Sequence, residues 1–305
     1  MNEGRNFRFL SSFWLKIVAI VFMTVDHLGV FLLMYSQNPD YASLGNLASL
    51  FRIIGRIALP LFLFMLAEGM RYTHSKWRYL LRLGYVCLPI FIAQMIDRFG
   101  LNNYFGFGNF SNVFLDLVLY ALILALLKEK GLKKLYALLP FAYIVMCYAV
   151  SVYEGYHDVT AIWLPNALRP GYSLYGLLAV LGFFYAPNIV YGIARKTLDE
   201  MGISREAFES SSQGRGVINA LGGAFFFLIN LGFWGLSFVA ATKTRTPWDS
   251  LLMSVQAWSV LAIPFLLLYN GKRGYDSKPF RIATYLYFVV HLVIIYLIFR
   301  VSFGY

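Results

Sequence analysis

Charged residues are scarce in this sequence. Asp, Glu, Lys and Arg make up 13% of its 305 residues, and 59% are hydrophobic, whereas a soluble domain carries about 25% charged residues. The hydrophobic residues gather in long runs with few charges inside them. This pattern excludes an ordinary soluble protein and is typical of a polytopic membrane protein.

Cysteine and histidine are also scarce, and their positions argue against two kinds of site. The two cysteines, Cys87 and Cys147, lie inside apolar runs, so we interpret them as small core residues and expect no disulfide framework. The four histidines do not cluster with cysteines at the spacing of metal ligands, and no glycine-rich phosphate loop is present. We therefore expect no metal cofactor.

The apolar runs predict an all-α fold of about nine transmembrane helices, each near the ~20 residues needed to cross a ~30 Å hydrocarbon core. The runs are residues 13–35, 49–70, 79–96, 111–128, 134–151, 172–196, 217–240, 250–270 and 280–300. We expect residues 1–305 to form a single transmembrane domain with a polar cytoplasmic loop at residues 197–216. No internal repeat is evident, which disfavours an inverted-repeat transporter.

Lysine and arginine are distributed unevenly between the segments that connect these runs. If the N-terminus lies in the cytoplasm, most of the 26 Lys and Arg residues lie on that side. The outer side then holds Arg98, Arg169, Lys243, Arg245 and Arg300. Cytoplasmic loops carry an excess of positive charge, so we predict a cytoplasmic N-terminus and an outer C-terminus. The net charge of +11 is then a topology signal, and no nucleic-acid binding is expected.

The first apolar run, LKIVAIVFMTVDHLGVFLLMY, carries three residues that are costly to hold in hydrocarbon. Lys16 and His27 are eleven residues apart, and at ~100° per residue this spacing puts both on one face, ~16 Å apart along the helix. Asp26 lies about 100° away from His27. One face therefore carries a cation near the cytoplasmic surface and an imidazole near mid-membrane.

Other polar residues lie near the depth of His27 if each helix rises ~1.5 Å per residue. They come from several further runs and are Arg56, Gln94, Asp116, Gln256 and His291. Such groups are rare in membranes and face a bundle interior or a water-filled cavity, so we interpret them as a functional site. Hydrogen bonds that only stabilise the bundle are the alternative. Near the cytoplasmic edge, Glu68 shares the level of Lys16 and either belongs to a site or neutralises nearby cations.

The stretch YNGKRGYDSKPFR, Tyr269 to Arg281, combines cations with glycine and asparagine on the expected cytoplasmic side. Cations attract phosphate groups, and glycine permits close approach of the backbone. The loop therefore suits a phosphate-bearing ligand, although the bias of cytoplasmic loops toward positive charge explains its composition equally well.

Three stretches resemble signature blocks of the TraX family. They are LKIVAIVFMTVDHLGVFL, FRIIGRIALPLFLFMLAEGMRYTHSKWRYLLRL and LLLYNGKRGYDSKPFRIATYLYFVVHLVIIYLI. TraX is the conjugal-transfer membrane protein linked to N-terminal acetylation of pilin. The family is in turn similar to transmembrane acyltransferases of the acyltransferase-3 superfamily, which carry a basic residue, ten intervening residues and a His in their first helix. Lys16 and His27 fit that pattern.

The resemblance implies a membrane-embedded acyltransferase, above all an acetyltransferase, that moves an acetyl group from cytosolic acetyl-CoA to an amine or hydroxyl. His27 would be the general base or the acyl carrier, and Arg56 would polarise the acyl carbonyl or stabilise the oxyanion. The expected catalytic residues are His27, Asp26, Arg56, Asp116 and His291. The residues expected to bind the acyl-CoA are Lys16, Glu68, Arg71, Asn270, Lys272, Arg273 and Lys278.

The expected acceptor is a peptide N-terminus, a sugar or a small amine, reached from the membrane or its outer side. The expected location is the inner or plasma membrane of a bacterium. A secondary transporter or lipid flippase that uses the same polar belt is the alternative function, and binding or hydrolysis of acetyl-CoA would distinguish the two. A non-catalytic scaffold is a third hypothesis, under which His27→Ala and Arg56→Ala leave function intact.

Overall fold

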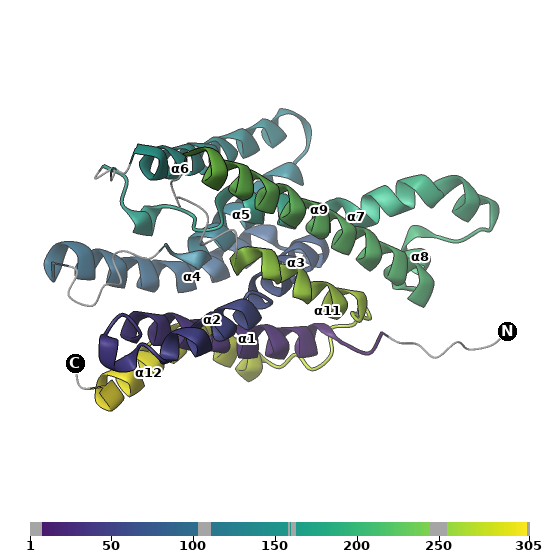
Figure 1. Cartoon of the computed structure of the whole chain (residues 1–305). Coiled ribbons are helices and arrows are strands. Elements are labelled where there is room, and N and C mark those ends of the chain that lie inside the picture. Colours follow the sequence, from purple (N-terminus) through teal and green to yellow (C-terminus); the bar gives the residue numbers. More distant parts are fainter. Residues whose placement is uncertain (1–7, 103–110, 158, 160–162, 245–254, 304–305) are drawn as a thin grey trace. The chain divides into compact units, whose positions relative to one another are not determined.

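The structure is a computed structural model that describes residues 8–102, 111–157, 159, 163–244 and 255–303 (Figure 1). The chain divides into two compact units. Unit 1 comprises Met1–Met65, Gly182–Leu231 and Val255–Tyr305, and unit 2 comprises Leu66–Leu181 and Gly232–Ser254.

The secondary structure of the described residues is helical, apart from an isolated β-bridge between Leu10 and Tyr269. Seven segments of this part of the chain are long and apolar enough to cross a membrane. They are Ser12–Tyr35, Leu44–Tyr72, Lys76–Gly100, Gly131–Glu154, Asn166–Glu200, Ser212–Leu236 and Lys278–Ser302. The predicted all-α fold is confirmed for these residues, and the seven helices indicate a multi-pass membrane protein.

Two of the nine predicted runs form shorter apolar helices, Val113–Leu127 and Ala257–Leu267. The predicted count of nine crossings is therefore not confirmed, and the predicted orientation stays a prediction. Residues 250–254 of the eighth predicted run lie outside the described residues, as does Arg245, which contributed to the charge argument.

Unit 1 contains the first and the last described helices. Its complete helices are α1 (Ser12–Tyr35), η1 (Pro39–Tyr41), α2 (Leu44–Gly55), α8 (Arg205–Ser210), η6 (Ala257–Ala262), α11 (Ile263–Leu267) and α12 (Lys278–Phe303). It also holds the start of α3 (Ala58–Tyr72), the end of α7 (Ser173–Glu200) and the start of α9 (Ser212–Thr244). Helices α1, α2 and α12 lie side by side (Figure 1).

Helices α1 and α12 run parallel. Ring contacts join Phe13 to Phe280 near the start of both helices, with 5.0 Å between centroids, and Phe31 to Phe299 near their ends, with 5.5 Å. Both helices therefore begin at the same end of unit 1. If both cross a membrane, the chain crosses it an odd number of times from the first to the last, a condition that seven and nine crossings both meet.

A break between α2 and α3 interrupts the predicted run at residues 49–70. Arg56 and Ile57 separate the two helices. Pro60 explains the break, because it lacks the N–H that would bond to the Arg56 carbonyl four residues earlier and its ring clashes with that carbonyl. Arg56 therefore ends α2 as its C-cap.

Glycines let α7 and α9 approach closely within unit 1. A Cβ on Gly182 would stand 3.2 Å from Cβ of Phe225, and a Cβ on Gly222 would stand 3.3 Å from a ring carbon of Phe183. Small residues at such positions are typical of helix interfaces in membranes. The predicted polar loop at residues 197–216 consists of the end of α7, the short helix α8 and the start of α9.

Unit 2 holds the middle of the chain. Its helices are α4 (Lys76–Met95), the π-helix η2 (Ile96–Gly100), α5 (Val113–Leu127), η4 (Gly131–Ala137), α6 (Leu138–His157) and η5 (Asn166–Leu168), with the end of α3, the start of α7 and the end of α9. Lys76 Nζ donates to the Ala125 carbonyl at 3.1 Å, and Asn112 Nδ2 donates to the Cys87 carbonyl at 3.2 Å. Helix α5 therefore begins beside the middle of α4, runs antiparallel to α4 and ends beside the first turn of α4.

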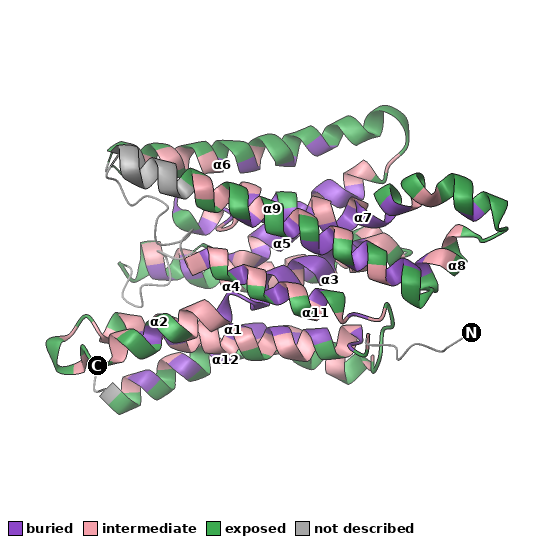
Figure 2. Cartoon of the chain, turned by 45° about the vertical axis from the view of Figure 1, so that its right-hand side comes forward, coloured by how far each residue is buried: buried purple, intermediate pink, exposed green. Residues whose placement is uncertain are grey.

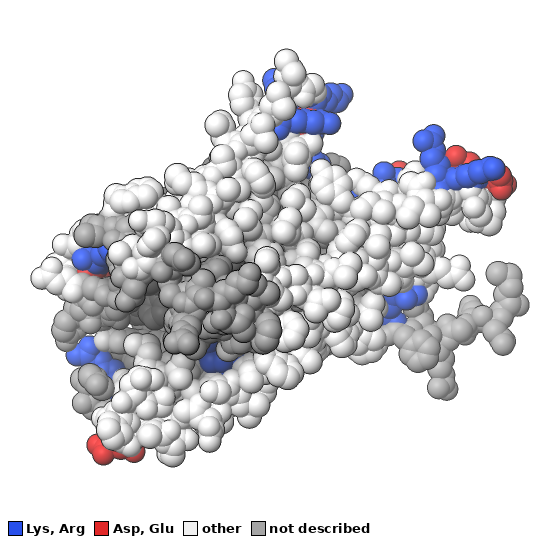
Figure 3. Space-filling model, turned by 45° about the horizontal axis from the view of Figure 1, so that its top comes forward, with Lys and Arg blue, Asp and Glu red and all other residues white. Residues whose placement is uncertain are grey.

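Much of the exposed surface is apolar. Helix α6 is exposed along most of its length (Figure 2), and its exposed side chains include Leu138, Leu139 and Phe141. On the face drawn in Figure 3, the described charged side chains gather in a few small groups and most of the surface is uncharged. Apolar surface of this extent suits contact with lipid.

Candidate functional site

Two histidines meet where α1 and α12 run side by side. His27 Nδ1 and His291 Nε2 are 2.8 Å apart, a hydrogen-bond distance. The ring centroids are 4.9 Å apart, and His291 is buried. The structure thus brings together two residues that the sequence places near one depth on different helices.

The hydrogen bonds of His291 assign the protons of both rings. His291 Nδ1 lies 2.6 Å from the carbonyl oxygen of Tyr287, and a carbonyl oxygen only accepts, so this nitrogen carries a proton. In the neutral ring His291 Nε2 is then an acceptor, and His27 Nδ1 must donate to it. Neutral His27 therefore keeps a lone pair on Nε2, and a lone pair is what a general base or a nucleophile needs.

A pair of hydroxyl groups lies one turn nearer the start of both helices. Tyr287 Oη and Thr24 Oγ1 are 2.6 Å apart, and Thr24 Oγ1 also donates to the Ile20 carbonyl at 2.9 Å. Because the Thr24 proton is used in that bond, the Tyr287 hydroxyl is the donor between the two. The Tyr287 ring also stacks on the His291 ring, at 5.0 Å and 6°. These contacts hold α1 and α12 in the register that the histidine pair needs.

Asp26 forms ion pairs with two guanidinium groups of α2. Its Oδ2 lies 2.6 Å from Arg52 Nη1, and its Oδ1 lies 2.5 Å from Arg56 Nη2. Arg52 lies one helical turn before Arg56, so one carboxylate serves both. The charges of both arginines also act on His27. The ion pairs and the histidine pair therefore form a single polar region.

Two glycines explain why α1 and α2 come close enough for these ion pairs. A Cβ on Gly55 would overlap Cβ of Asp26, and a Cβ on Gly29 would stand 3.0 Å from backbone atoms of Ala48 and Arg52. A larger residue at either position would push the two helices apart. The short distance from Asp26 to the arginines therefore depends on glycine at both positions.

Gln256, which immediately precedes η6, joins the same region. Its Oε1 accepts a hydrogen bond from Arg56 Nη1 at 3.1 Å, and the residue is 1% exposed. Within the described part of the chain, its Nε2 has no hydrogen-bond partner. We call the group formed by Asp26, His27, Arg52, Arg56, Gln256 and His291 the polar centre.

The loop before α12 is hydrogen-bonded to the start of α1. Ser12 N donates to the Lys272 carbonyl at 2.9 Å, and Phe13 N donates to the Arg273 carbonyl at 3.1 Å. Gly274 has a φ of +70°, a left-handed conformation that glycine adopts readily. Carbonyl groups of the loop thus satisfy the first amides of α1, which have no partner inside the helix.

Lys16 lies among the charges of this loop. Its ammonium group stands 5.3 Å from the centroid of the Phe280 ring, and Asp276, Arg281 and Arg273 act on it electrostatically. Asp276 pairs with Arg273 at 3.3 Å and with Arg281 at 3.0 Å. A predicted donor-binding lysine of α1 and a predicted donor-binding arginine of the loop therefore lie at one end of unit 1.

Further predicted donor-binding residues lie on the same loop. Asn270 Oδ1 accepts from the Lys272 amide at 2.8 Å, and Lys278 is exposed at the start of α12. Arg215, from the first turn of α9, stands 5.6 Å from the centroid of the Tyr269 ring at the start of the loop. We call Lys16, Arg215, Asn270, Lys272, Arg273, Lys278 and Arg281 the cationic end.

Other predicted site residues, Glu68, Arg71 and Asp116, belong to unit 2, as does the buried Gln94. The fully buried Asp116 carboxylate accepts from the amides of residues 171–173 at 2.8 to 3.0 Å, and from Tyr120 Oη at 2.9 Å. These amides lie at the start of α7, where a carboxylate acts as a helix cap. The structure gives Asp116 this capping role, and its catalytic role stays a prediction.

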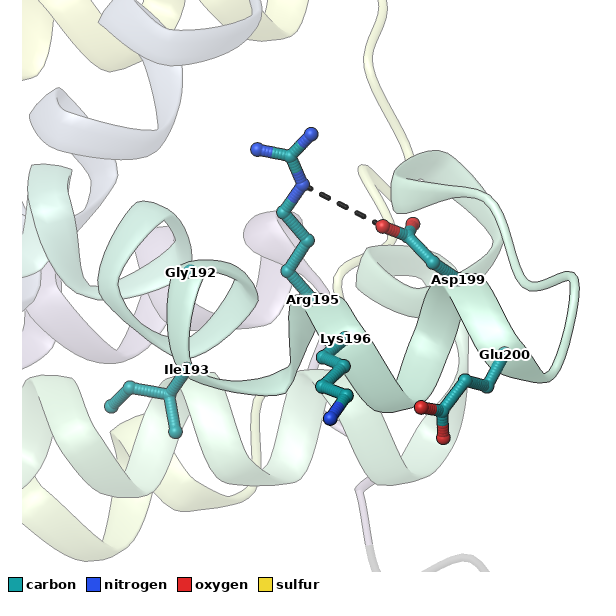
Figure 4. A pocket seen from close by; sticks show the side chains of 6 residues that line it. All are labelled: Gly192, Ile193, Arg195, Lys196, Asp199 and Glu200. Atoms are coloured by element: carbon teal, nitrogen blue, oxygen red, sulfur yellow. Dashed lines mark ion pairs between the residues drawn. The ribbon is translucent and has the colours of Figure 1, made fainter.

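An open hollow lies along the last turns of α7 (Figure 4). Its lining residues are Gly192, Ile193, Arg195, Lys196, Asp199 and Glu200. Arg195 Nε and Asp199 Oδ2 are 3.6 Å apart, and both side chains are exposed to solvent. Because all of its lining comes from the surface of one helix, the hollow is a weaker candidate than the polar centre.

The family model named "TraX protein" matches residues 11–175, which is more than half of the chain. The chain belongs to the TraX family. It is also similar to a protein described as "Probable fimbrial assembly protein FimC, serogroup H1" from Dichelobacter nodosus, with 35% identity over 131 residues. That alignment covers 41% of this chain and 47% of the D. nodosus protein, so it spans about half of the relative's length. No solved structure matches the chain.

The TraX match contains only one side of the polar centre. Residues 11–175 include Asp26, His27 and both arginines. Gln256 and His291 come after the matched region, as does the loop of the cationic end. The part of the chain beyond the TraX match therefore supplies the partner of His27.

Sequence reasoning missed three contributors to this site. Arg52 was available as a signal, because two arginines four residues apart inside an apolar run face the same way. Thr24 and Tyr287 gave none, since hydroxyl side chains are ordinary in transmembrane helices and bond to their own backbone. Only the register of α1 and α12 shows that these two meet.

Proposed function

We propose that this TraX-family protein is a membrane-embedded acyltransferase that takes its acyl group from acetyl-CoA or another short acyl-CoA. The proposal is supported chiefly by the tautomer of His27, whose Nδ1 donates to His291 while Nε2 keeps its lone pair. A base positioned in this way accepts the proton of an attacking nucleophile. The spacing of Lys16 and His27 is also that of the acyltransferase-3 superfamily, and we propose a relationship to it.

The proposed reaction transfers the acyl group from sulfur to nitrogen or oxygen. The acceptor amine or hydroxyl attacks the thioester carbonyl carbon, and His27 Nε2 takes the proton that the acceptor loses. The carbonyl π electrons move onto oxygen and return as the carbon–sulfur bond breaks. The CoA thiolate leaves with that electron pair and receives the proton from His27. In a variant of this mechanism His27 Nε2 attacks first and carries the acyl group, which needs the same tautomer.

The cationic end is the proposed binding site for the phosphates of the donor. Lys272, Arg273 and Lys278 are exposed, and cationic side chains are the usual partners of phosphate. Lys16 lies at this end of α1, ~16 Å along the helix from His27. The arm that joins the phosphates of CoA to its thioester would span that distance. The start of α1 would then hold the nucleotide, and its middle would hold the reacting group.

We further propose that the protein acts in pilus processing in the inner or plasma membrane of a bacterium. TraX family membership supports this role, and so does the similarity to the D. nodosus protein described as a probable fimbrial assembly protein. The acceptor would be an amine or hydroxyl reached from the membrane or the outer side, with the acyl-CoA bound from the cytoplasm.

Calorimetric titration of the detergent-purified protein with acetyl-CoA tests the proposal. Lys16→Ala should weaken binding by about tenfold, since a charge-assisted phosphate contact is worth on the order of 1.5 kcal/mol. His27→Ala should bind acetyl-CoA as the unmodified protein does but release no CoA thiol. Arg195→Ala, which removes an exposed cation of α7, is the control and should change neither. Absence of binding at millimolar acetyl-CoA would contradict the proposal and favour a transport path through the polar centre.

A further inference from the structure

The side-chain amide of Gln256 is held at one atom and leaves the other without a partner. Its Oε1 accepts from the Arg56 guanidinium, which fixes the amide orientation because a guanidinium only donates. The Nε2 group is then turned away from Arg56 and has no hydrogen-bond partner among the described residues. Burying such a donor unsatisfied is costly, and buried donors in proteins are nearly always paired. The described residues supply no oxygen for this donor, so it can donate to a bound molecule.

The position of Gln256 relates this donor to the proposed chemistry. Gln256 is bonded to Arg56, and Arg56 is paired with Asp26, the residue that precedes His27. The charge of Arg56 also acts on His27. A buried N–H donor and a buried guanidinium are thus linked to Asp26, the chain neighbour of a base with a lone pair. The transfer of an acyl group needs these components together, because negative charge develops on oxygen while a proton is removed.

We propose that Gln256 is a catalytic residue whose Nε2–H donates a hydrogen bond to the thioester carbonyl oxygen as that oxygen becomes negatively charged. This inference rests on the proposed acyltransferase function and adds a specific residue to it. The acceptor adds to the carbonyl carbon, the π pair moves to oxygen, and Gln256 Nε2 stabilises that charge until the pair re-forms the carbonyl. Arg56 supplies positive charge and holds the amide, and His27 Nε2 holds the proton.

The contact with Arg56 explains why a neutral amide suits this position. The amide needs no reorganisation as charge develops, because Arg56 already holds its oxygen. Such preorganised donors act strongly in buried sites of low dielectric. A carboxylate in the same place would accept from Arg56 equally well, but it would repel the developing oxyanion. The two roles of Gln256, as acceptor from Arg56 and as donor to substrate, can therefore be separated by substitution.

The release of CoA thiol from acetyl-CoA, measured on the purified full chain, separates the acceptor role of Gln256 from its donor role. Gln256→Glu keeps the acceptor for Arg56 and removes the donor, and Gln256→Met removes both at similar size. Both substitutions should lower kcat by about 10² to 10³-fold, and the kcat of Gln256→Glu should be the lower of the two. KM should change less than about threefold, because the contact forms mainly in the transition state. Ser259→Ala is the matched control, since Ser259 is a buried polar residue of η6 that bonds to Asn230, and it should leave kcat unchanged.

Each result bears on the proposal in a defined way. Rates are compared per molecule that binds acetyl-CoA, so a variant that folds poorly does not mimic a catalytic loss. If the unmodified protein turns over acetyl-CoA and both variants keep kcat within about threefold, Gln256 has a structural partner such as water and the inference is overturned, while the proposed function stands. If the unmodified protein neither binds nor turns over acetyl-CoA, the proposed function is overturned and the inference with it.

Discussion

The polar centre of unit 1 and the Asp116 site of unit 2 differ in how completely their hydrogen bonds are used. Asp116 accepts from three backbone amides and one hydroxyl, which nearly fills the capacity of a carboxylate. In the polar centre, His27 Nε2 keeps a lone pair, and the N–H donor of Gln256 Nε2 has no partner among the described residues. Both sites contain residues that the sequence placed at one membrane depth.

The difference shows that depth alone does not distinguish structural from chemical roles. When the fold fills the hydrogen-bonding capacity of a buried group, the hydrogen bonds of that group stabilise the native structure. A buried group with capacity remaining is less favourable for stability and open to a substrate. Substitutions at the two sites should therefore change different measured quantities.

The largest expected effect is on stability, in Asp116→Ala. The change removes the cap of α7 and leaves the amides of residues 171–173 without this acceptor, while the Tyr120 hydroxyl keeps the Ser173 carbonyl. We expect a loss of about 3 kcal/mol or more in the free energy of unfolding, because several bonds to a charged group are lost at once. Thermal unfolding in detergent measures this loss, and Asp40→Ala at an exposed position is the control. Turnover per folded molecule tests the predicted catalytic role of Asp116: unchanged turnover would show that the residue is structural, and a loss of turnover at full stability would reverse the comparison.

The next effect is on turnover, in His291→Ala. Without His291, the imidazole of His27 can rotate and adopt either tautomer, so kcat should fall roughly 10- to 100-fold, as when a group that orients a functional imidazole is removed. Acetyl-CoA affinity should not change, because the cationic end is untouched. His291→Gln can still accept from His27 Nδ1 and should restore part of the rate. Equal kcat in all three proteins would show that the histidine pair is a structural contact like the Asp116 cap.

The smallest effect is expected at a partly exposed ion pair of unit 2. Lys76 Nζ and Glu129 Oε1 are 2.6 Å apart, and the hydrogen bond from Lys76 lowers the pKa of the Glu129 carboxyl below its usual range. A lowered pKa means that the stabilisation is present above the ordinary glutamate pKa and is lost as the pH falls through the lowered value. Glu129→Gln should therefore reduce the melting temperature slightly at pH 7, and the difference should vanish in acid. Glu200→Gln is the control, and a pH-independent difference would contradict the ion-pair explanation.

The sequence predicted most of the long apolar helices, because these follow from the length of the apolar runs, and the common depth of the polar side chains stays a prediction. It could not predict which of these residues would face one another. His27 and His291 meet because α1 and α12 are parallel neighbours, whereas Asp116 bonds to the start of α7, and neither arrangement follows from depth. The break at Arg56 carried a readable signal in Pro60, but the run was apolar enough to conceal it. The sequence could not predict that Gln256 accepts from Arg56 with one atom and leaves the other as a donor, because only packing determines the direction of its amide.

The parallel pairing of α1 and α12 has a consequence for biosynthesis. His27 and His291 are separated by 264 residues, so at ~5 to 20 residues per second the ribosome adds the second histidine roughly 13 to 53 s after the first. During that interval α1 has been made but His291, which sets the tautomer of His27, has not. A nascent chain interrupted before α12 lacks His291, so under the proposed mechanism the paired base forms only after α12 has been made.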